Sequence, residues 1–406
     1  MKKITTLLAI VLIMALVLSV PASAEGTKTL TYAGWLVMPQ EWLDQVYADT
    51  GITLEYEQVE SKNYADIITT RLSGGTGPDI FYGYNLDCVK NYSAAGYGLD
   101  LTDYDWLREN VRADFVDDAI LFGNGRAYGF SEVISCANIL FYNKDIFDEY
   151  GLEVPTNIDE YIAVCDKLVE NGVTPFIHSV LEANHLKRLP FEPICIVNAQ
   201  KGGADWVQGL ATGESKFTDD IYVKATEYFV NAVNKGYYSD LCPGITHVEA
   251  WQLFCEGEAA MMTGATFYFD QNYAEFKPEF ELGLAPDPLN FEGEAHVTGG
   301  KYSEFIMGNA NNGKDEIILE YLQYFAEHLA DWTKYTGMAT PSTKPLGDWS
   351  DYAGLFDIVN SFPMEAGYRQ PSTVQKDLEA WEQGVFAGTA GLEGPELLQQ
   401  KLEGVI

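Results

Sequence analysis

Basic residues are scarce in this chain. Lys and Arg together number 25 against 60 Asp and Glu, which gives a formal net charge of −35 at pH 7 over 406 residues. A surface with so few cations repels the phosphates of nucleic acids and anionic membrane surfaces. The composition therefore argues against nucleic acid and membranes as partners. It favours a solubilised surface over a cation-binding function.

Motifs that hold metals or nucleotides are also missing. The chain has no Cys-x-x-Cys, and none of its five histidines begins a His-Glu-x-x-His sequence. Asp100, Asp103 and Asp105 lie close together, but no glycine and terminal glutamate complete a calcium loop. Gly300-Lys301 lacks the flanking residues of a phosphate-binding loop. We therefore expect no cofactor and no metal site.

The cysteines do not define a disulfide framework. Among the six, Cys242 and Cys255 are the only pair close in sequence. Because spacing alone does not establish disulfide geometry, their pairing stays open at this point.

Long apolar runs are absent except at the start of the chain. Residues 7–18 are apolar and uncharged, behind Lys2 and Lys3 and ahead of Pro21. The run is short for a membrane span, and residues 22–24 are small, as a signal peptidase requires. We therefore expect residues 1–24 to be a signal peptide and the mature chain to be soluble outside the cytoplasm.

Short apolar strands alternate with amphipathic helices along the chain. We expect strands at residues 29–33, 52–57, 79–82 and 139–142, and helices at 39–48, 63–73, 219–235, 315–328, 374–386 and 395–403. A further helix opens at Pro155, with Thr156 as its cap and Asp159 as the reciprocal partner. The alternation predicts parallel βαβ units and a layered α/β fold. The length predicts two domains, and since no linker is visible, the chain should cross between them more than once.

Aromatic residues are abundant, with 25 Tyr, 21 Phe and 8 Trp. Most of them fill cores. In an exported protein, however, the excess also favours a sugar site, because sugar rings pack their C–H groups on aromatic faces.

Four stretches, in this order, carry a resemblance to a known family. They are YADIITTRLSGGTGPDI at 64–80, LFYNKDIF at 140–147, FCEGEAAMM at 254–262, and LGLAP at 282–286 followed by TGGK at 298–301. The chain resembles the family 1 extracellular solute-binding proteins of ABC importers, which include maltose-binding protein and other sugar-binding members. The resemblance covers essentially the whole mature chain.

The resemblance implies the two-lobed periplasmic-binding-protein fold, an α/β architecture with a ligand cleft between the lobes and a hinge of several strands. Lobe one is expected at 25–136 and 286–335, and lobe two at 137–285 and 336–406. It implies a monomeric binding subunit that captures a sugar or oligosaccharide, closes around it and delivers it to the membrane permease. It does not imply an enzyme.

Ligand contacts are expected in loops at the strand ends that face the cleft. The resemblance points to Trp35, Tyr84, Asn85, Glu132, Ser135, His185, Phe267, Tyr268, Lys301 and Tyr368. For Trp35, cleft stacking and core packing both stay open. A carboxylate at Glu132 could accept two sugar hydroxyls, or it could lie in a solvated loop. Phe267 or Tyr268 would replace the tryptophan that relatives carry after Gly264. No catalytic residue is expected.

One departure from the family concerns anchoring. Gram-positive members carry a lipidated cysteine where the signal ends, and residues 20–24 contain none. This favours a periplasmic protein or one held at the cell surface by its partners. Two alternatives to a sugar receptor stay open: a binding protein for a polyamine, metal chelate or peptide, and an extracellular glycoside hydrolase, which needs two facing carboxyl groups.

Overall fold

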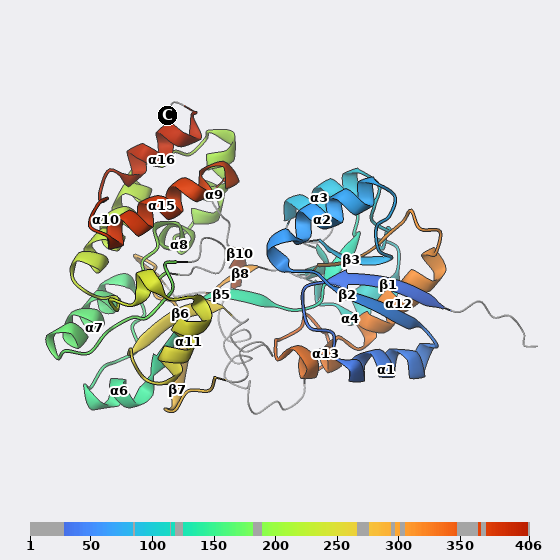
Figure 1. Ribbon diagram of the computed structural model, residues 1–406, viewed down its shortest axis with the longest axis horizontal. Helices are drawn as coiled ribbons and strands as arrows, with labels where there is room; N and C mark the ends of the chain where they lie inside the picture. Colours follow the sequence, from blue (N-terminus) through green and yellow to red (C-terminus); the bar gives the residue numbers. More distant parts are fainter. Residues whose placement is uncertain are drawn as a thin grey trace, which may run out of the picture.

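The computed structural model describes residues 28–83, 86–113, 115–117, 125–181, 189–265, 276–293, 297–300, 305–346, 364–366 and 371–404. These residues form two bodies side by side, each built around one β-sheet with helices packed on it (Figure 1). The predicted two-lobed α/β fold is therefore confirmed. Within these ranges, no helix combines the length and apolarity needed to cross a membrane.

The first sheet has the strand order β2-β1-β3-β9-β4. Its strands are β1 (Thr29–Gly34), β2 (Thr53–Gln58), β3 (Ile80–Gly83), β4 (Gly129–Ser131) and β9 (Phe305–Gly308). β1 runs parallel to β2 and β3, whereas β9 is antiparallel to β3 and β4. The helices of this body are α1 (Gln40–Thr50), α2 (Ser61–Ser73), α3 (Leu86–Ala94), α4 (Asp105–Asn110), α12 (Asp315–Glu327) and α13 (Leu329–Thr336). Figure 1 shows α2 and α3 on one side of the sheet and α1 and α13 on the other.

The second sheet is organised around β5 (Ser135–Asn143). Its other strands are β6 (Met261–Ala265), β7 (Leu282–Pro286), β8 (Val297–Gly300) and β10 (Met364–Ala366), in the order β10-β8-β5-β6 with β7 also paired to β5. The helices here are α6 (Lys144–Glu149), α7 (Ile158–Glu170), α8 (Pro193–Asn198), α9 (Gly203–Thr212), α10 (Asp220–Asn234), α11 (His247–Cys255), α15 (Gln375–Phe386) and α16 (Gly394–Leu402), with short 3-10 turns at Cys242–Gly244 and Ser372–Val374. Side chains of β5 alternate between two cores: Ile139 and Phe141 lie in the core that includes β1 and β3, and Leu140 lies in the core of α7, α8 and α10.

Most elements expected from hydrophobic periodicity are present within one or two residues of their predicted ends, but the cap of α7 differs. Asn157, not Thr156, is the N-cap, and its side chain accepts from the backbone N–H of Glu160. Glu160 in turn accepts from the backbone N–H and the hydroxyl of Thr156. The cap is therefore shifted by one residue from the predicted one, because Asn and Thr are both good caps and the helix begins after the second. The carboxylate of Glu160 bonds Thr156, the residue before the cap, and not the cap itself.

The chain crosses between the sheets three times. It leaves the first sheet after β4 and enters β5, returns between β8 and β9, and leaves again after α13 to reach β10. β8 lies in the residues expected for lobe one, yet it pairs with β5 in the second sheet. The reason is that β7 occupies the edge of β5 only from Ile139 to Asn143, so the same edge is free at Ser135 to Ala137, where β8 pairs.

The cysteines whose pairing the sequence left open are both free thiols. Cys242 and Cys255 lie in different hydrophobic cores, so no disulfide joins them. Burial raises the pKa of the Cys242 thiol to about 11, and it is therefore unreactive at neutral pH.

Asp79 ties the amino ends of β1 and β3 to the loop before α12. The residue is 1% exposed, and its side chain accepts hydrogen bonds from the backbone N–H of Thr31 at 2.8 Å, from Asn312 Nδ2 at 2.8 Å and from Lys314 Nζ at 2.8 Å. Burial works to raise the pKa of this carboxyl, but the bonds from Lys314, Thr31 and Asn312 outweigh it, and the pKa lies below its usual range. The Pro-Asp at 78–79 is thus a structural tie between distant segments.

We predict that Asp79→Asn lowers the free energy of unfolding by about 1–3 kcal/mol at pH 7, because buried donors lose their charged acceptor. Since the folded pKa is depressed, this contribution is present above the unfolded value of 3.8 and is lost as pH falls through the folded pKa. Urea denaturation of both proteins from pH 3 to pH 7 measures it. The exposed pair Arg71–Glu57 supplies the control: Glu57→Gln should cost less than about 1 kcal/mol. Equal effects of the two substitutions would contradict the prediction.

Asp287 is a buried acid with the opposite behaviour. It follows β7, is 4% exposed, and donates its backbone N–H to the carbonyl of Asn138 in β5. Its Oδ1 has no hydrogen-bond partner, and burial raises the pKa to about 8, with the neighbouring Tyr161 hydroxyl opposing the shift. Asp287 is therefore mainly protonated at neutral pH.

We predict that wild-type stability falls as pH rises from about 4 toward 8, by up to about 1.4 kcal/mol per pH unit, because only the unfolded state releases the proton of Asp287 easily. Asp287→Asn should remove this loss, so its stability relative to wild type increases between pH 5 and pH 9 in urea titrations. Asp159→Asn, at an exposed position of α7, should leave the wild-type pH profile intact. A pH profile of Asp287→Asn that parallels wild type would contradict the assignment.

Candidate functional site

The candidate site begins at the carboxyl ends of the parallel strands β1 and β3, where ligands commonly bind in open α/β sheets. Trp35 directly follows β1, Tyr82 is the last residue but one of β3, and Glu132 directly follows β4. Two of the residues expected from the sequence, Trp35 and Glu132, are therefore brought to one edge of the first sheet. Tyr82 was not among the residues expected at the site, although it lies two residues before the expected pair Tyr84 and Asn85.

Glu132 lies beneath this edge rather than on its surface. It is 0% exposed, Oε1 accepts from the Tyr82 hydroxyl at 2.5 Å, and Oε2 accepts from the Tyr32 hydroxyl at 3.2 Å. Burial and then the Glu132 charge raise the pKa of both tyrosines well above the usual value, so both hydroxyls stay protonated donors at neutral pH. A role for Glu132 as a direct ligand contact stays a prediction.

Trp35 is half-buried and packs edge-on against two of the surrounding tyrosines. Its ring centroid lies 4.6 Å from that of Tyr82 and 4.7 Å from that of Tyr64. Tyr64 is held in turn by two hydrogen bonds, from its hydroxyl to the carbonyl of Ala33 at 2.8 Å and from the backbone N–H of Tyr82 at 2.7 Å. Trp35 thus combines core packing with partial exposure.

The second sheet contributes the start of β5 and the ends of its neighbours. Ser135 is in register with Gly300, the last residue before Lys301, and Ala137 is in register with Ala265, the last described residue before Phe267 and Tyr268. Backbone pairing therefore places the ends of β6 and β8 beside the start of the crossing strand. The side chain of Ser135 and the residues Tyr84, Asn85, His185, Phe267, Tyr268, Lys301 and Tyr368 lie outside what the structure describes.

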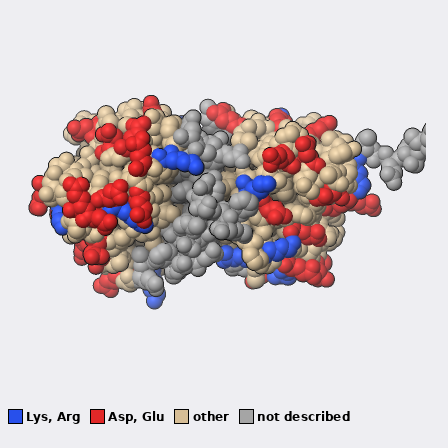
Figure 2. All heavy atoms as spheres, turned by 90° about the horizontal axis from the view of Figure 1, so that it is seen from below, with Lys and Arg blue, Asp and Glu red and all other residues tan. Residues whose placement is uncertain are grey.

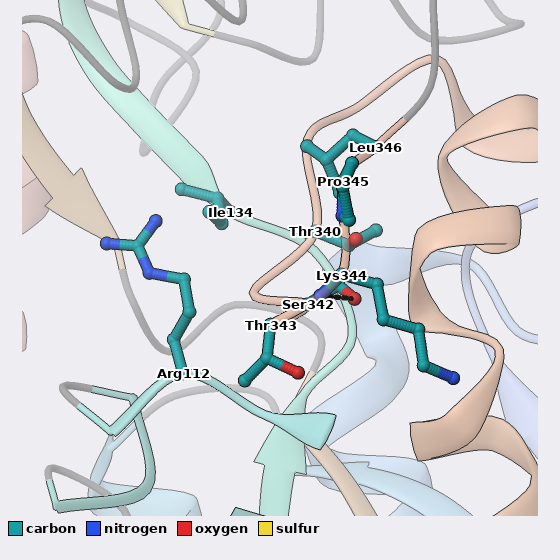
Figure 3. Close-up of a pocket in the computed structure, with 8 residues that line it drawn as sticks. All are labelled: Arg112, Ile134, Thr340, Ser342, Thr343, Lys344, Pro345 and Leu346. Carbon is teal, nitrogen blue, oxygen red and sulfur yellow. Dashed lines mark hydrogen bonds between the residues drawn. The ribbon is translucent and has the colours of Figure 1, made fainter. Parts of the chain in front are cut away.

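A cavity of about 330 Å³ opens beside the crossing, and its lining was not expected from the sequence. It is lined by Arg112, Ile134, Thr340, Ser342, Thr343, Lys344, Pro345 and Leu346. Arg112 and the 340–346 loop face each other across it (Figure 3). Two backbone bonds close the group, from Ile134 N–H to the Ala339 carbonyl and from Arg112 N–H to the Pro341 carbonyl. Its place next to the crossing expected near 336 was the only signal available in the sequence.

The lining hydroxyls and the lysine of this cavity are already bonded within the protein. Ser342 Oγ accepts from the backbone N–H of Lys344, Thr343 Oγ1 donates to the Glu109 carbonyl, and the Lys344 ammonium donates to the Glu327 carbonyl. The cavity therefore supplies a mixed polar surface. In the described part of the chain, no three His, Cys, Asp or Glu side chains gather as a metal site.

The surface charge agrees with the composition. Figure 2 shows Asp and Glu spread over both bodies on one face, with Lys and Arg in small isolated groups.

A two-lobed α/β fold with several crossings is the architecture expected of a solute-binding protein. The family model described as bacterial extracellular solute-binding protein matches residues 37–328, which is well over half of the chain. The chain belongs to this family, and the resemblance found in the sequence motifs is confirmed.

Individual relatives are distant. An uncharacterised ABC transporter extracellular-binding protein of Pyrococcus horikoshii is 29% identical over 234 residues, 56% of this chain and 51% of that protein. The multiple sugar-binding protein of Streptococcus mutans is 23% identical over 57% of this chain and 55% of that protein. The chain thus matches about half the length of each. A solved structure from work on xylan utilisation by Caldanaerobius polysaccharolyticus has a TM-score of 0.72 at 20% identity, covering 93% of this chain and 100% of that chain. That likeness establishes the fold.

Proposed function

We propose that this protein is the solute-receiving subunit of an ABC importer, and that it captures a sugar or oligosaccharide outside the cytoplasm for delivery to a membrane permease. Membership of the extracellular solute-binding family supports the receptor role. The names of relatives, an ABC transporter binding protein and a multiple sugar-binding protein, support the transport system and the class of solute. The observation that carries the proposal for this chain is the half-buried Trp35 held by tyrosines at the sheet edge.

The chemistry of a sugar matches such a site. A pyranose presents C–H groups on its faces, which pack on an aromatic ring, and hydroxyls on its rim, which require donors and acceptors. In the proposal, Trp35 is the platform on lobe one. The remaining contacts would come from Tyr84, Asn85, Ser135, His185, Phe267, Tyr268, Lys301 and Tyr368, with the expected acid Glu132 buried beneath the platform.

Closure of the lobes is the proposed mechanism. Three crossings allow a rigid-body hinge motion while they keep the lobes in register. A ligand between the lobes contacts both only in the closed form, so binding would shift the population toward it. The proposed lobes are residues 25–136 with 286–335 and 137–285 with 336–406, with β8 assigned by its pairing to the second. Export by the signal at 1–24 and a monomeric state are part of the same proposal.

A receptor rather than an enzyme is proposed for a chemical reason. Glycoside hydrolysis needs two carboxyl groups on opposite sides of the scissile bond. At the described site, the carboxylate of Glu132 accepts hydrogen bonds from two buried tyrosines. An acid in that state is poorly placed to attack or protonate a sugar.

We predict that a soluble saccharide raises the melting temperature of the mature protein. At about 100 times the dissociation constant, binding stabilises the folded state by about 2.7 kcal/mol. The measurement is a thermal-shift panel of maltose, maltotriose, xylobiose, raffinose and chitobiose, with spermidine as the non-sugar control. Chromatography after long incubation should recover the bound saccharide unchanged. A shift with spermidine alone would replace sugar with polyamine, and smaller products would establish a hydrolase.

We predict that Trp35→Ala weakens binding of the panel saccharide with the largest shift by about 1–3 kcal/mol, because the stacking surface is lost. Isothermal titration of wild type and variant measures the dissociation constants. Trp206 is the matched control, since it is also half-buried but lies on α9, far from the first sheet and bonded to Asp219 (Figure 1). Trp206→Ala should keep wild-type affinity, and equal losses in the two variants would contradict a role for Trp35 in binding.

A further inference from the structure

The buried carboxylate of Glu132 joins three separate segments of the first lobe. Tyr32 comes from the middle of β1, Tyr82 from the end of β3, and Glu132 from the segment between β4 and β5. The two hydrogen bonds span 100 and 50 residues of sequence. We propose that Glu132 is a positioning residue that fixes the Trp35 platform and links it to the lobe crossing. This inference rests on the proposed function, because it takes Trp35 as the sugar platform and assigns Glu132 as the residue that holds it in place.

A buried carboxylate is tolerated only when donors replace its lost hydration. Here the donors include two tyrosine hydroxyls, so the acid restrains the orientation of both rings. Charge-assisted bonds of this type are stronger than neutral ones, and the Tyr82 bond of 2.5 Å is at the short end of the range. Loss of the acid would leave two buried hydroxyls without their acceptor.

Tyr82 transmits this restraint to Trp35 by direct packing. The two ring centroids are 4.6 Å apart, and the backbone N–H of Tyr82 also holds the Tyr64 hydroxyl, the second wall of Trp35. The approach is close on the other side too. A Cβ added at Gly34, the residue before Trp35, would lie 2.7 Å from a ring carbon of Tyr82. Tyr82 therefore packs closely against both Gly34 and Trp35.

The same acid lies on the segment that leads into the second lobe. Ile134, two residues on, donates its backbone N–H to the Ala339 carbonyl at 2.6 Å, which joins it to the segment that follows α13. Ser135 then begins β5 and pairs with Gly300. The anchor of the aromatic platform is thus within three residues of strands in the other sheet. In the proposal, a displacement of Trp35 is transmitted through Tyr82 and Glu132 to the segment that crosses between the lobes.

Asp79 provides a matched comparison in the same sheet. It is also a fully buried carboxylate with several donors, but it precedes β3 whereas Tyr82 lies near the end of that strand. The hydrogen bonds of Asp79 described above go to Thr31, Asn312 and Lys314. None of these bonds involves Trp35 or the segment before β5. Asp79→Asn therefore removes a buried charge without disturbing the proposed linkage.

The experiment compares Glu132→Gln, Tyr82→Phe and Asp79→Asn in the full mature chain. The first measurement needs no ligand. Acrylamide quenching of Trp35 is isolated by subtracting the emission of the same variant carrying Trp35→Phe. We expect Glu132→Gln and Tyr82→Phe to raise the quenching constant of Trp35 at least about twofold, and Asp79→Asn to leave it at the wild-type value while lowering stability.

The second measurement is the dissociation constant for the panel saccharide that shifts wild type most. Glu132→Gln and Tyr82→Phe should each weaken it by about 5- to 30-fold, and the double variant should lose little more, because both remove one linkage. Asp79→Asn should bind as wild type does at temperatures where it is folded.

Three results would overturn the proposal. Wild-type quenching in both Glu132→Gln and Tyr82→Phe would show that the acid does not position Trp35. Loss of binding beyond about 1,000-fold with Trp35 unmoved would make Glu132 a direct ligand residue. If the losses of binding free energy add up in the double variant, Glu132 and Tyr82 act independently and not through one linkage. If Glu132→Gln does not fold, Tyr82→Phe decides the question alone. If wild type binds no panel saccharide, the sugar assignment fails, and the quenching result still decides the positioning role.

Discussion

The strand β5 is the constraint on which the arrangement of this protein depends. It leaves the first lobe next to Glu132, and β6, β7 and β8 are all hydrogen-bonded to it directly. Since β7 and β8 share one of its edges, the position of each limits the other. The ends of β6 and β8 consequently lie beside the point where the chain enters the second lobe. One strand therefore sets both the second sheet and the geometry of the crossing.

Three buried acids illustrate how neighbours, rather than residue type, determine what a carboxylate does. Asp79 meets an ammonium, an amide and a backbone N–H, and its charge is stabilised. Oδ1 of Asp287 has no hydrogen-bond partner within the described part of the chain, and burial raises the pKa of this carboxyl to about 8. Glu132 meets two tyrosine hydroxyls from different strands. The first ties strands together, the second makes stability depend on pH, and the third connects the candidate binding surface with the crossing.

Local sequence patterns predicted much of the fold because their causes are local. Hydrophobic periodicity predicted β1 to β3, α2 and the C-terminal helices, since alternation and helical spacing follow from backbone geometry alone. The cap of α7 was wrong by one residue, because two adjacent residues, Thr156 and Asn157, can both cap a helix. The residues of β8 were expected in lobe one, yet β8 pairs with β5 in the second sheet. Such pairing depends on which strand edges the other strands leave free.

By itself, the sequence determined the two-lobed α/β class, the family and the place of Trp35 after the first strand, all of which follow from patterns within a few residues. Only the tertiary structure decided what surrounds each candidate. From the sequence, Glu132 could be an acid for ligand hydroxyls or part of a solvated loop, and both interpretations leave it exposed. The fold buries it because Tyr32 and Tyr82, 100 and 50 residues away, converge on it from neighbouring strands. Burial and hydrogen-bond partners depend on such distant segments, and no local pattern encodes them.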